Sequence, residues 1–386
     1  MIERTHIGFF GRRNTGKSSL VNAVTGQNLS VVSNIPGTTT DPVRKSMELV
    51  PLGPVMIIDT PGFDDEGTLG ELRVKKTQEI LREVNIAVLV IDAAVGMTDI
   101  DEELQRLFEQ QGTPYLVVAN KCDLPHATSQ NHQASALTGH GVDALKELLA
   151  QLTSQKKELR LLADLFAPGD FAVLVTPIDA AAPKDRMILP QSHAIRDILD
   201  ANAICVATQP GELRKTIAVL QGPPALVITD SQVFAQVAEI LPPELPLTSF
   251  SILFARYKGF LQAAVAGVEA LAQLPEGARI LIAEGCTHHR QCDDIGTVKL
   301  PRMIQAKLSR SFAFSFCTGH EFPEDLSPYA LVVHCGGCML NARAVQSRRD
   351  LAQAQAVPFS NYGVTLAWLQ GILERCLLDG KLCAPS

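Results

Sequence analysis

Short apolar runs alternate with longer amphipathic stretches over the first part of the chain. The runs cover residues 7–10, 55–58, 86–91 and 115–119, and each precedes a loop and a stretch with helical spacing. Strands that alternate with helices are typical of a parallel sheet, because the connection between parallel strands is long enough to hold a helix. The pattern therefore predicts an α/β unit in this part of the chain.

The same alternation continues after a stretch that predicts a long amphipathic helix over residues 144–165. Leucines at positions 145, 148, 149, 152, 159 and 162 indicate this helix, and Ala167, Pro168 and Gly169 follow it as a boundary. Further apolar runs cover 171–175, 203–207, 225–229, 279–283, 312–316 and 331–334, with helical spacing over 192–201, 211–220 and 364–378. We predict three α/β domains with mainly parallel sheets, over residues 1–167, 168–262 and 263–386.

Composition and charge narrow the class of partner. The 386 residues contain 34 Lys and Arg against 41 Asp and Glu, which gives a formal net charge of −7 without a basic stripe. A dedicated DNA or RNA binder needs a basic surface, so we expect no nucleic-acid partner. No apolar run reaches the ~18 residues that cross a bilayer, so we expect no membrane partner either.

The start of the chain and its cysteines bear on the compartment. Residues 1–6 lack a basic region followed by an apolar stretch, the pattern of a secretory signal, so a cytoplasmic location is expected. In that reducing setting the nine cysteines are expected to be thiols or metal ligands rather than disulfides.

A phosphate-binding motif follows the first apolar run. Residues Gly11 to Ser18 fit the pattern G-x-x-x-x-G-K-[ST] before a helical stretch. Backbone N–H groups of such a loop surround phosphates, Lys17 reaches the β- and γ-phosphates, and the Ser18 hydroxyl binds Mg²⁺. The candidate nucleotide contacts here are Gly11, Asn14, Thr15, Gly16, Lys17, Ser18 and Ser19.

Three further motifs follow in the order that a GTPase requires. Asp59 ends the run 55–58, where its carboxylate can hold the metal through water, and the amide of Gly62 can meet the γ-phosphate. Asn120, Lys121, Cys122 and Asp123 follow the run 115–119. Asp123 can accept hydrogen bonds from the N1–H and the exocyclic amine of guanine, a donor pair that adenine lacks, so the motif selects GTP. Ser135 and Ala136 are expected to complete the guanine pocket.

Together these motifs resemble those of the translation-factor-like GTPases, and residues 35–41 resemble switch I of the Era and TrmE branch. The resemblance implies that Thr39, or Thr38 one residue earlier, senses Mg²⁺ and the γ-phosphate. It assigns catalysis to Lys17, Thr39, Asp59 and Gly62.

Potassium activation is a second implication of that branch. Asn14 resembles the asparagine that helps to bind K⁺ in its potassium-activated members, which implies faster GTP hydrolysis in KCl than in NaCl. An asparagine there can also be a turn residue that tolerates a left-handed backbone. Phe63 follows Gly62, whereas Ras-like enzymes place a water-positioning Gln one residue further on.

Cysteines and histidines gather in two short segments near the C-terminus. Cys286 and His288 form a C-x-H pattern, and His334, Cys335 and Cys338 form H-C-x-x-C. Both segments follow predicted strands, so in a parallel sheet their loops can converge on one edge. C-x-x-C brings two thiolates within reach of one metal centre, and the two intervening glycines free the backbone to present N–H groups to cluster sulfides.

The pattern alone leaves four interpretations open. The first is a structural zinc site that uses two or three of these cysteines with His288 or His334. The second is a thioredoxin-like pair at Cys335 and Cys338, and the third is a chance grouping of buried thiols and histidines. The fourth is an iron–sulfur cluster with three cysteine ligands, which leaves one iron with an exchangeable ligand.

An Era/TrmE-like P-loop GTPase domain, followed by two smaller α/β domains and this cysteine pattern, resembles the HydF family of FeFe-hydrogenase maturation GTPases. The resemblance covers essentially the whole chain. It implies a GTP-hydrolysing scaffold or carrier that receives a di-iron precursor bearing CO and cyanide. Two radical SAM maturases would build the precursor, and apo FeFe-hydrogenase would receive it.

The resemblance also implies a cluster and an assembly. Cys286, Cys335 and Cys338 would bind a [4Fe–4S] cluster, with His288 or His334 as candidate fourth ligand, and residues 168–262 would form a homodimer. The expected cofactors are thus GTP, Mg²⁺, the [4Fe–4S] cluster and K⁺ as an activator.

Two other functions compete with this one. The first domain alone fits a ribosome-assembly or tRNA-modification GTPase with a structural zinc domain, although the chain lacks a G-x-x-G loop in a KH-like context. An iron–sulfur or zinc redox enzyme with a regulatory GTPase domain is the second alternative. It is weakened by the missing second cysteine cluster and dinucleotide fingerprint.

Overall fold

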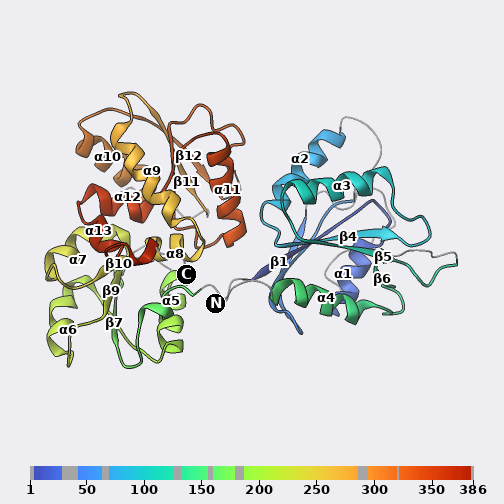
Figure 1. The fold of residues 1–386 in the computed structure, drawn as a ribbon, viewed down its shortest axis with the longest axis horizontal. Coiled ribbons are helices and arrows are strands. Elements are labelled where there is room, and N and C mark those ends of the chain that lie inside the picture. Colours follow the sequence, from blue (N-terminus) through green and yellow to red (C-terminus); the bar gives the residue numbers. More distant parts are fainter. Residues whose placement is uncertain are drawn as a thin grey trace. The chain divides into compact units, whose positions relative to one another are not determined.

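The chain forms two compact units, residues 2–158 and 159–386. The computed structural model describes residues 4–27, 42–62, 69–125, 132–154, 160–178, 187–285, 294–319 and 321–383. Figure 1 shows the elements of both units.

The first unit is a six-stranded sheet with strand order β2-β3-β1-β4-β5-β6. All neighbouring strands pair in parallel except β2 and β3, which form an antiparallel pair. Its strands are β1 (Thr5–Phe10), β2 (Val43–Leu49), β3 (Gly53–Asp59), β4 (Ile86–Asp92), β5 (Tyr115–Asn120) and β6 (His132–Gln133). Its helices are α1 (Lys17–Thr25), α2 (Leu69–Leu81), α3 (Asp99–Gln110) and α4 (Val142–Ser154).

Each face of this sheet is buried under helices. On one face Ile7 and Phe9 pack in a cluster with residues of α1 and α4, and on the other face Phe10 packs with residues of α2 and α3. A central strand buried on both faces reads as a continuous apolar run, as β4 does with Ile-Ala-Val-Leu-Val-Ile. Because both faces of the sheet are buried and apolar, the polar groups lie at the carboxyl ends of the strands, where the loops begin.

The second unit holds two four-stranded parallel sheets, with strand orders β10-β9-β7-β8 and β12-β11-β13-β14. The strands are β7 (Phe171–Val175), β8 (Ile204–Thr208), β9 (Leu226–Thr229), β10 (Leu247–Ser249), β11 (Arg279–Glu284), β12 (Ala313–Thr318), β13 (Leu331–His334) and β14 (Phe359–Asn361). The α-helices are α5 (Leu189–Asp200), α6 (Leu213–Val219), α7 (Phe234–Ile240), α8 (Phe250–Tyr257), α9 (Leu261–Gln273), α10 (Leu300–Leu308), α11 (Ala342–Ala354), α12 (Tyr362–Leu369) and α13 (Leu373–Cys376). Shorter turns are η1 (Ala163–Leu165), η2 (Pro210–Glu212), η3 (Ser231–Val233), η4 (Ile295–Lys299) and η5 (Lys381–Cys383).

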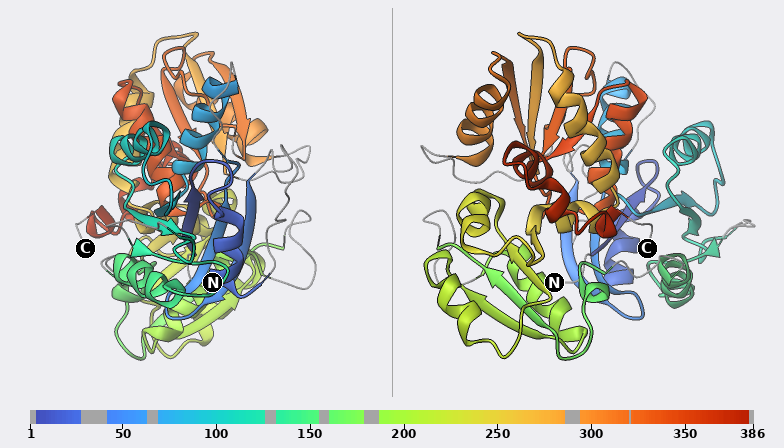
Figure 2. Two further views of the ribbon diagram at one scale, coloured as in Figure 1. Left: turned by 90° about the vertical axis from the view of Figure 1, so that its right-hand side faces the viewer. Right: turned by 60° about the vertical axis from the view of Figure 1, so that its left-hand side comes forward.

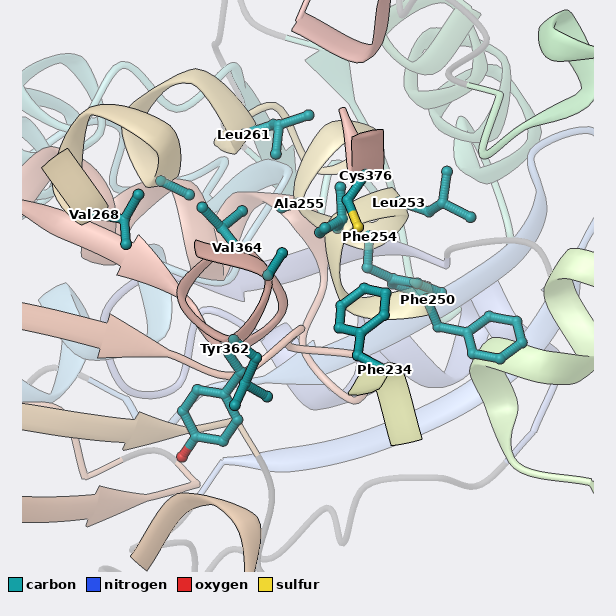
Figure 3. Packing of buried hydrophobic residues seen from close by; sticks show 14 of the residues in the cluster. Phe234, Phe250, Leu253, Phe254, Ala255, Leu261, Val268, Tyr362, Val364 and Cys376 are labelled. Carbon is teal, nitrogen blue, oxygen red and sulfur yellow. The ribbon is translucent and has the colours of Figure 1, made fainter. Parts of the chain in front are cut away.

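One continuous apolar core joins the two sheets of this unit. Figure 3 shows Phe234, Phe250 and Phe254 in the same cluster as Val364 and Cys376, which come from the end of the chain. The Thr248 hydroxyl of β10 donates to the carbonyl oxygen of Cys376 at 2.8 Å. The right-hand view of Figure 2 shows the red C-terminal helices beside the yellow part of the chain. The C-terminal residues thus close the core of the sheet that precedes them.

The predicted fold class, α/β with mainly parallel sheets, is confirmed, but two predicted helices are wrong. The helix predicted over 144–165 is described as α4 only to Ser154, and residues 160–165 are not α-helical. Leu161 and Leu162 are fully buried in the core of the second unit, where the N–H of Leu162 donates to Asp197. The division at residue 158 therefore precedes the predicted boundary at 167, while the predicted division at 262 stays a prediction.

The helix predicted over 364–378 is interrupted. The structure has α12 and α13 instead, separated by Gly371 with a φ of 73°. The N–H groups of Gly371 and Ile372 donate to the carbonyl oxygens of Trp368 and Ala367, the pattern of a glycine-terminated helix. A single glycine in a left-handed conformation thus turns the chain toward β10.

Gly267 in α9 provides a test of this packing. A Cβ atom there would lie 2.3 Å from the Phe359 carbonyl oxygen in β14, so we expect Gly267→Ala to lower the free energy of unfolding by about 1–3 kcal/mol. Urea unfolding of the full chain, followed by fluorescence of Trp368, the one tryptophan, measures the change. Gly222→Ala, at a position with open space around it, is the control and should change stability by less than about 0.5 kcal/mol. Equal midpoints for both variants would contradict the close packing.

Candidate functional site

The loop between β1 and α1 has the conformation of a phosphate cradle. Gly11, Asn14 and Gly16 have φ values of 141°, 62° and 83°. A Cβ atom at Gly11 would lie 2.3 Å from the Val90 carbonyl oxygen, and one at Gly16 would lie 2.3 Å from Nδ2 of Asn120. Both glycines are therefore required by close approach as well as by backbone conformation.

Charged and hydroxyl groups converge on this loop. Lys17 is 6% exposed, and its Nζ donates to the carbonyl oxygens of Gly11 and Arg12 at 2.9 and 2.7 Å. The Ser18 hydroxyl donates to Oδ2 of Asp59 at 2.7 Å. The predicted Mg²⁺-binding hydroxyl and the carboxylate at the end of β3 thus lie side by side. Gly62 lies against the same loop, since a Cβ atom there would be 2.8 Å from the Arg13 Cα.

A cavity of about 630 Å³ opens beside the loop, and its lining includes Gly16, Ser19, Asn120, Asp123 and Ala136. Asn120 holds its walls together: Nδ2 donates to the Thr15 carbonyl oxygen at 2.9 Å, and Oδ1 accepts from the Ala136 N–H at 3.1 Å. The predicted phosphate and guanine motifs therefore meet at one cavity.

Hydrogen bonds of Ser135 and Lys121 support the loops around this cavity. Ser135 is fully buried, and its hydroxyl oxygen accepts from the Thr138 N–H at 3.1 Å. Lys121 Nζ donates to the Asn14 carbonyl oxygen at 2.7 Å and to Oδ2 of Asp92 at 2.8 Å. Burial alone would raise the pKa of Asp92, but the hydrogen bonds from Lys121 and from the Ala94 N–H lower it below its ordinary value.

An ion pair that the sequence did not reveal also braces the phosphate loop. Arg12 Nε donates to Oδ2 of Asp101 at 2.9 Å, and Asp101 is fully buried at the start of α3. The same oxygen accepts from the N–H and the hydroxyl of Thr98 at 3.1 and 2.8 Å. The conformation of the loop is therefore tied to the N-terminus of α3. No motif signal could have identified Asp101, because it lies in an acidic helix start that reads as a helix cap.

Some predicted nucleotide residues lie outside the described part of the chain. Thr38, Thr39 and Phe63 are among them, so their assignments stay predictions. The left-handed φ of Asn14 matches the alternative of a turn residue and does not test the K⁺ assignment.

The second candidate site lies where β11 and β13 end. The two strands pair in parallel with Ala283 beside His334, and the Cys335 N–H donates to the Ala283 carbonyl oxygen at 2.8 Å. The N–H groups of Gly285 and Gly337 donate to Cys335 Sγ at 3.1 and 3.3 Å. The predicted convergence of the two strand ends on one sheet edge is confirmed. Cys286 and His288 lie outside the described residues.

His334 is fully buried, and both of its ring nitrogens have protein partners. Nε2 lies 3.0 Å from Nη1 of Arg348, and Nδ1 lies 2.7 Å from the Cys335 carbonyl oxygen. Burial and then the charge of Arg348 lower the pKa of His334 to about 3, so the ring is neutral at physiological pH. In this conformation both ring nitrogens of His334 are engaged by protein groups, and its assignment as a candidate cluster ligand stays a prediction.

A buried lysine closes the other end of the cysteine loop. Lys258 is 2% exposed, and its Nζ donates to the carbonyl oxygens of Gly337 and Leu340. Burial raises the pKa of the Cys338 thiol, and the charge of Lys258 counteracts part of this rise. Gly337 has a φ of 62°, and a Cβ there would meet Val345 at 2.9 Å. The loop after β13 thus makes a sharp turn next to the ammonium group of Lys258.

Burial disfavours the thiolate form of the described cysteines on this edge. Burial raises the pKa of both Cys335 and Cys317 to about 11. Cys317 on β12 stands beside Ala283 across the sheet. Among the described residues, no group of three or more His, Cys, Asp or Glu side chains is placed to hold a metal. Metal binding by these thiols would release their protons.

Comparison with known proteins relates each segment to a family. Residues 6–121 match the family model "50S ribosome-binding GTPase", residues 161–259 match "Hydrogen maturase F dimerization domain", and residues 262–378 match "Hydrogen maturase F tetramerization domain". The chain is 35% identical over 159 residues to the tRNA modification GTPase MnmE of Synechococcus sp. (strain JA-3-3Ab), which covers 39% of this chain and 34% of that protein. It is 38% identical over 121 residues to GTPase Der of Wolinella succinogenes, covering 31% and 26%.

The chain spans about a third of the length of these curated relatives or less. Among solved structures, an Aquifex aeolicus Era variant bound to GDP.AlF4- is 19% identical, with a TM-score of 0.35, and the match covers 57% of this chain and 99% of that one. No described helix is long and apolar enough to cross a membrane.

A P-loop GTPase domain joined to two parallel α/β sheets with a shared core defines the class of this protein. The two maturase models together cover more than half of the chain and leave almost no gap between them. The chain belongs to the hydrogen maturase F (HydF) family.

Asp123 provides the test of the guanine pocket. Asparagine there would present a donor to the guanine N1–H, so Asp123→Asn should weaken GTP binding by about 10–100-fold, the effect of losing a charge-assisted hydrogen bond, and improve binding of XTP. Calorimetric titration with GTP, ATP and XTP measures the change. Asp143→Asn, which neutralises an exposed carboxylate of α4, is the control. Unchanged preference for GTP in Asp123→Asn would contradict the assignment.

Proposed function

We propose that this protein is a GTP-hydrolysing scaffold that carries a di-iron precursor bearing CO and cyanide to apo FeFe-hydrogenase. The observation that supports the proposal is the parallel pairing of β11 with β13. Just beyond the C-terminal ends of these strands, the Gly285 N–H donates to Cys335 Sγ. Gly285 directly precedes Cys286 in the chain. The pairing therefore brings the residue before the first predicted cluster ligand against the second.

The residues of this edge fit an iron–sulfur cluster. Cys335 Sγ accepts two backbone N–H groups, which is how cluster-bound thiolates are stabilised and their potentials tuned. Cys286, Cys335 and Cys338 would hold the [4Fe–4S] cluster. When bound, it would supply one iron without a cysteine ligand, at which an exchangeable ligand can bind. Because both nitrogens of His334 are engaged, His288 is the remaining histidine candidate.

The first unit would hydrolyse GTP through the residues placed around its phosphate loop. Lys17 would exchange its carbonyl partners for the β- and γ-phosphates, and the Ser18 hydroxyl would turn from Asp59 to Mg²⁺. Asp59 would then hold the metal through water, and the amide of Gly62 would meet the γ-phosphate. Thr39 would complete the site when GTP is bound, and Asn14 would help to bind K⁺.

The assembly and partners belong to the same proposal. Residues 168–262 would form a homodimer, a role that the dimerization model over 161–259 supports. The tetramerization model over 262–378 adds a higher assembly that the sequence did not predict. Two radical SAM maturases would supply the precursor. The tRNA-modification and ribosome alternatives rest on the first unit alone, whereas the maturase models cover the remainder of the chain.

Delivery of the precursor is the direct test. The purified full chain, reconstituted anaerobically and loaded with a di-iron complex bearing CO and cyanide, is incubated with apo FeFe-hydrogenase, and hydrogen evolution is measured. We expect activation by the wild type and by Cys205→Ala, whose thiol lies in β8 of the other sheet. Cys335→Ala should lower the activation at least tenfold. Equal activation by Cys335→Ala, or none by the wild type, would overturn the proposal.

A further inference from the structure

Arg348 on α11 is a buried cation beside the cysteine loop. It is 7% exposed, its Nη2 donates to the Gly319 carbonyl oxygen, and its guanidinium lies 5.0 Å from the centre of the Phe322 ring. Within the described part of the chain, no carboxylate is among its hydrogen-bond or ion-pair partners. An arginine stays charged in proteins, so a positive charge is buried here, and none of its described hydrogen-bond partners is a carboxylate.

Arg348 contacts His334, the residue before Cys335, and the thiols of Cys317 and Cys335 lie near enough to the guanidinium to interact with its charge. A buried charge is strongly disfavoured unless an opposite charge pairs with it. The surroundings of Arg348 are therefore suited to an anionic centre at Cys335.

Arg348 also fixes the geometry of that centre through His334. Arginine can only donate hydrogen bonds, so Nε2 of His334 must accept from Nη1, at 3.0 Å. The single ring proton of the neutral His334 then lies on Nδ1 and is donated to the Cys335 carbonyl oxygen at 2.7 Å. The imidazole is stacked on Phe359, with ring centres 5.8 Å apart. Donation thus runs in one direction, from Arg348 to the backbone of Cys335.

We propose that Arg348 is a positioning residue that holds the Cys335 backbone through His334 and supplies the counter-charge of the iron–sulfur cluster. This inference rests on the proposed function, because it assumes that a cluster is bound at Cys335. It assigns a role to a residue in a helix that belongs to none of the sequence motifs.

The counter-charge has a measurable consequence for reduction. Three thiolates on an oxidised core of charge 2+ leave the centre negative, and one electron from dithionite makes it more negative. A nearby buried cation stabilises the reduced form more than the oxidised form, because the attraction grows with the charge of the centre. Removal of the Arg348 charge should therefore make the cluster harder to reduce.

The test is a potentiometric titration of the reconstituted full chain, monitored by EPR. Arg348→Met removes the charge and keeps a side chain of similar length. We expect its one-electron reduction equilibrium to shift about tenfold against reduction, which is about 59 mV for such a couple, with fewer irons retained per chain. Arg349→Met is the matched control, since Arg349 is the next residue of α11 and donates to the Gly259 carbonyl oxygen and to Asp350. It should shift the equilibrium less than about twofold.

Two further variants distinguish the effect of losing the charge from the effect of misfolding. Arg348→Lys keeps the charge but cannot reach both partners of Arg348, so its potential should stay nearer the wild type than that of Arg348→Gln. This comparison replaces Arg348→Met if circular dichroism shows that Arg348→Met is unfolded. A wild-type potential and iron content in the neutral variant would overturn the inference while the proposed function stands. A wild-type chain that binds zinc and no cluster would overturn the proposed function and this role together.

Discussion

The parallel pairing of β11 with β13 is the constraint on which the candidate metal site depends. The register places Ala283 beside His334, so the first loop residue after β11 and the cysteine after β13 leave the sheet at the same edge. The Cys335 N–H completes this pairing with the Ala283 carbonyl oxygen. A shift by one residue would reverse the face to which each side chain points. Gly285 and Cys335, 50 residues apart in the sequence, are thereby made neighbours.

The same principle builds the nucleotide site. β1, β3 and β5 end at one edge of the first sheet: Asp59 and Asn120 are the last residues of β3 and β5, and Lys17 begins the helix that follows β1. Asn120 then bonds to both the phosphate loop and the Ala136 segment. In each unit, polar groups gather at the strand ends because the strands themselves are buried and apolar. Cationic side chains then hold the loops: Lys121 and Arg12 at the phosphate loop, and the buried Lys258 and Arg348 at the cysteine loop.

Motifs and strand runs could be predicted from the sequence because their physical signals are local. The phosphate loop, Asp59, Asn120 and the cysteine pairs each sit directly after an apolar run, and all of these runs form strands. Arg348 gave no such signal, because a helix with Arg343, Arg348 and Arg349 reads as a solvated face. Leu161 and Leu162 fitted the spacing of the preceding helix but pack into the second unit. Their partners are distant in sequence, and spacing cannot identify them.

We propose that one chain combines a GTPase domain with an iron–sulfur centre held by Cys286, Cys335 and Cys338. Anaerobic reconstitution with iron and sulfide, followed by metal analysis and EPR of the dithionite-reduced protein, tests it most directly. We expect about four irons per chain and an S = 1/2 signal in the wild type, with both lost when the three cysteines are changed to alanine. Tightly held zinc without that signal, or an unchanged signal in the triple variant, would contradict it.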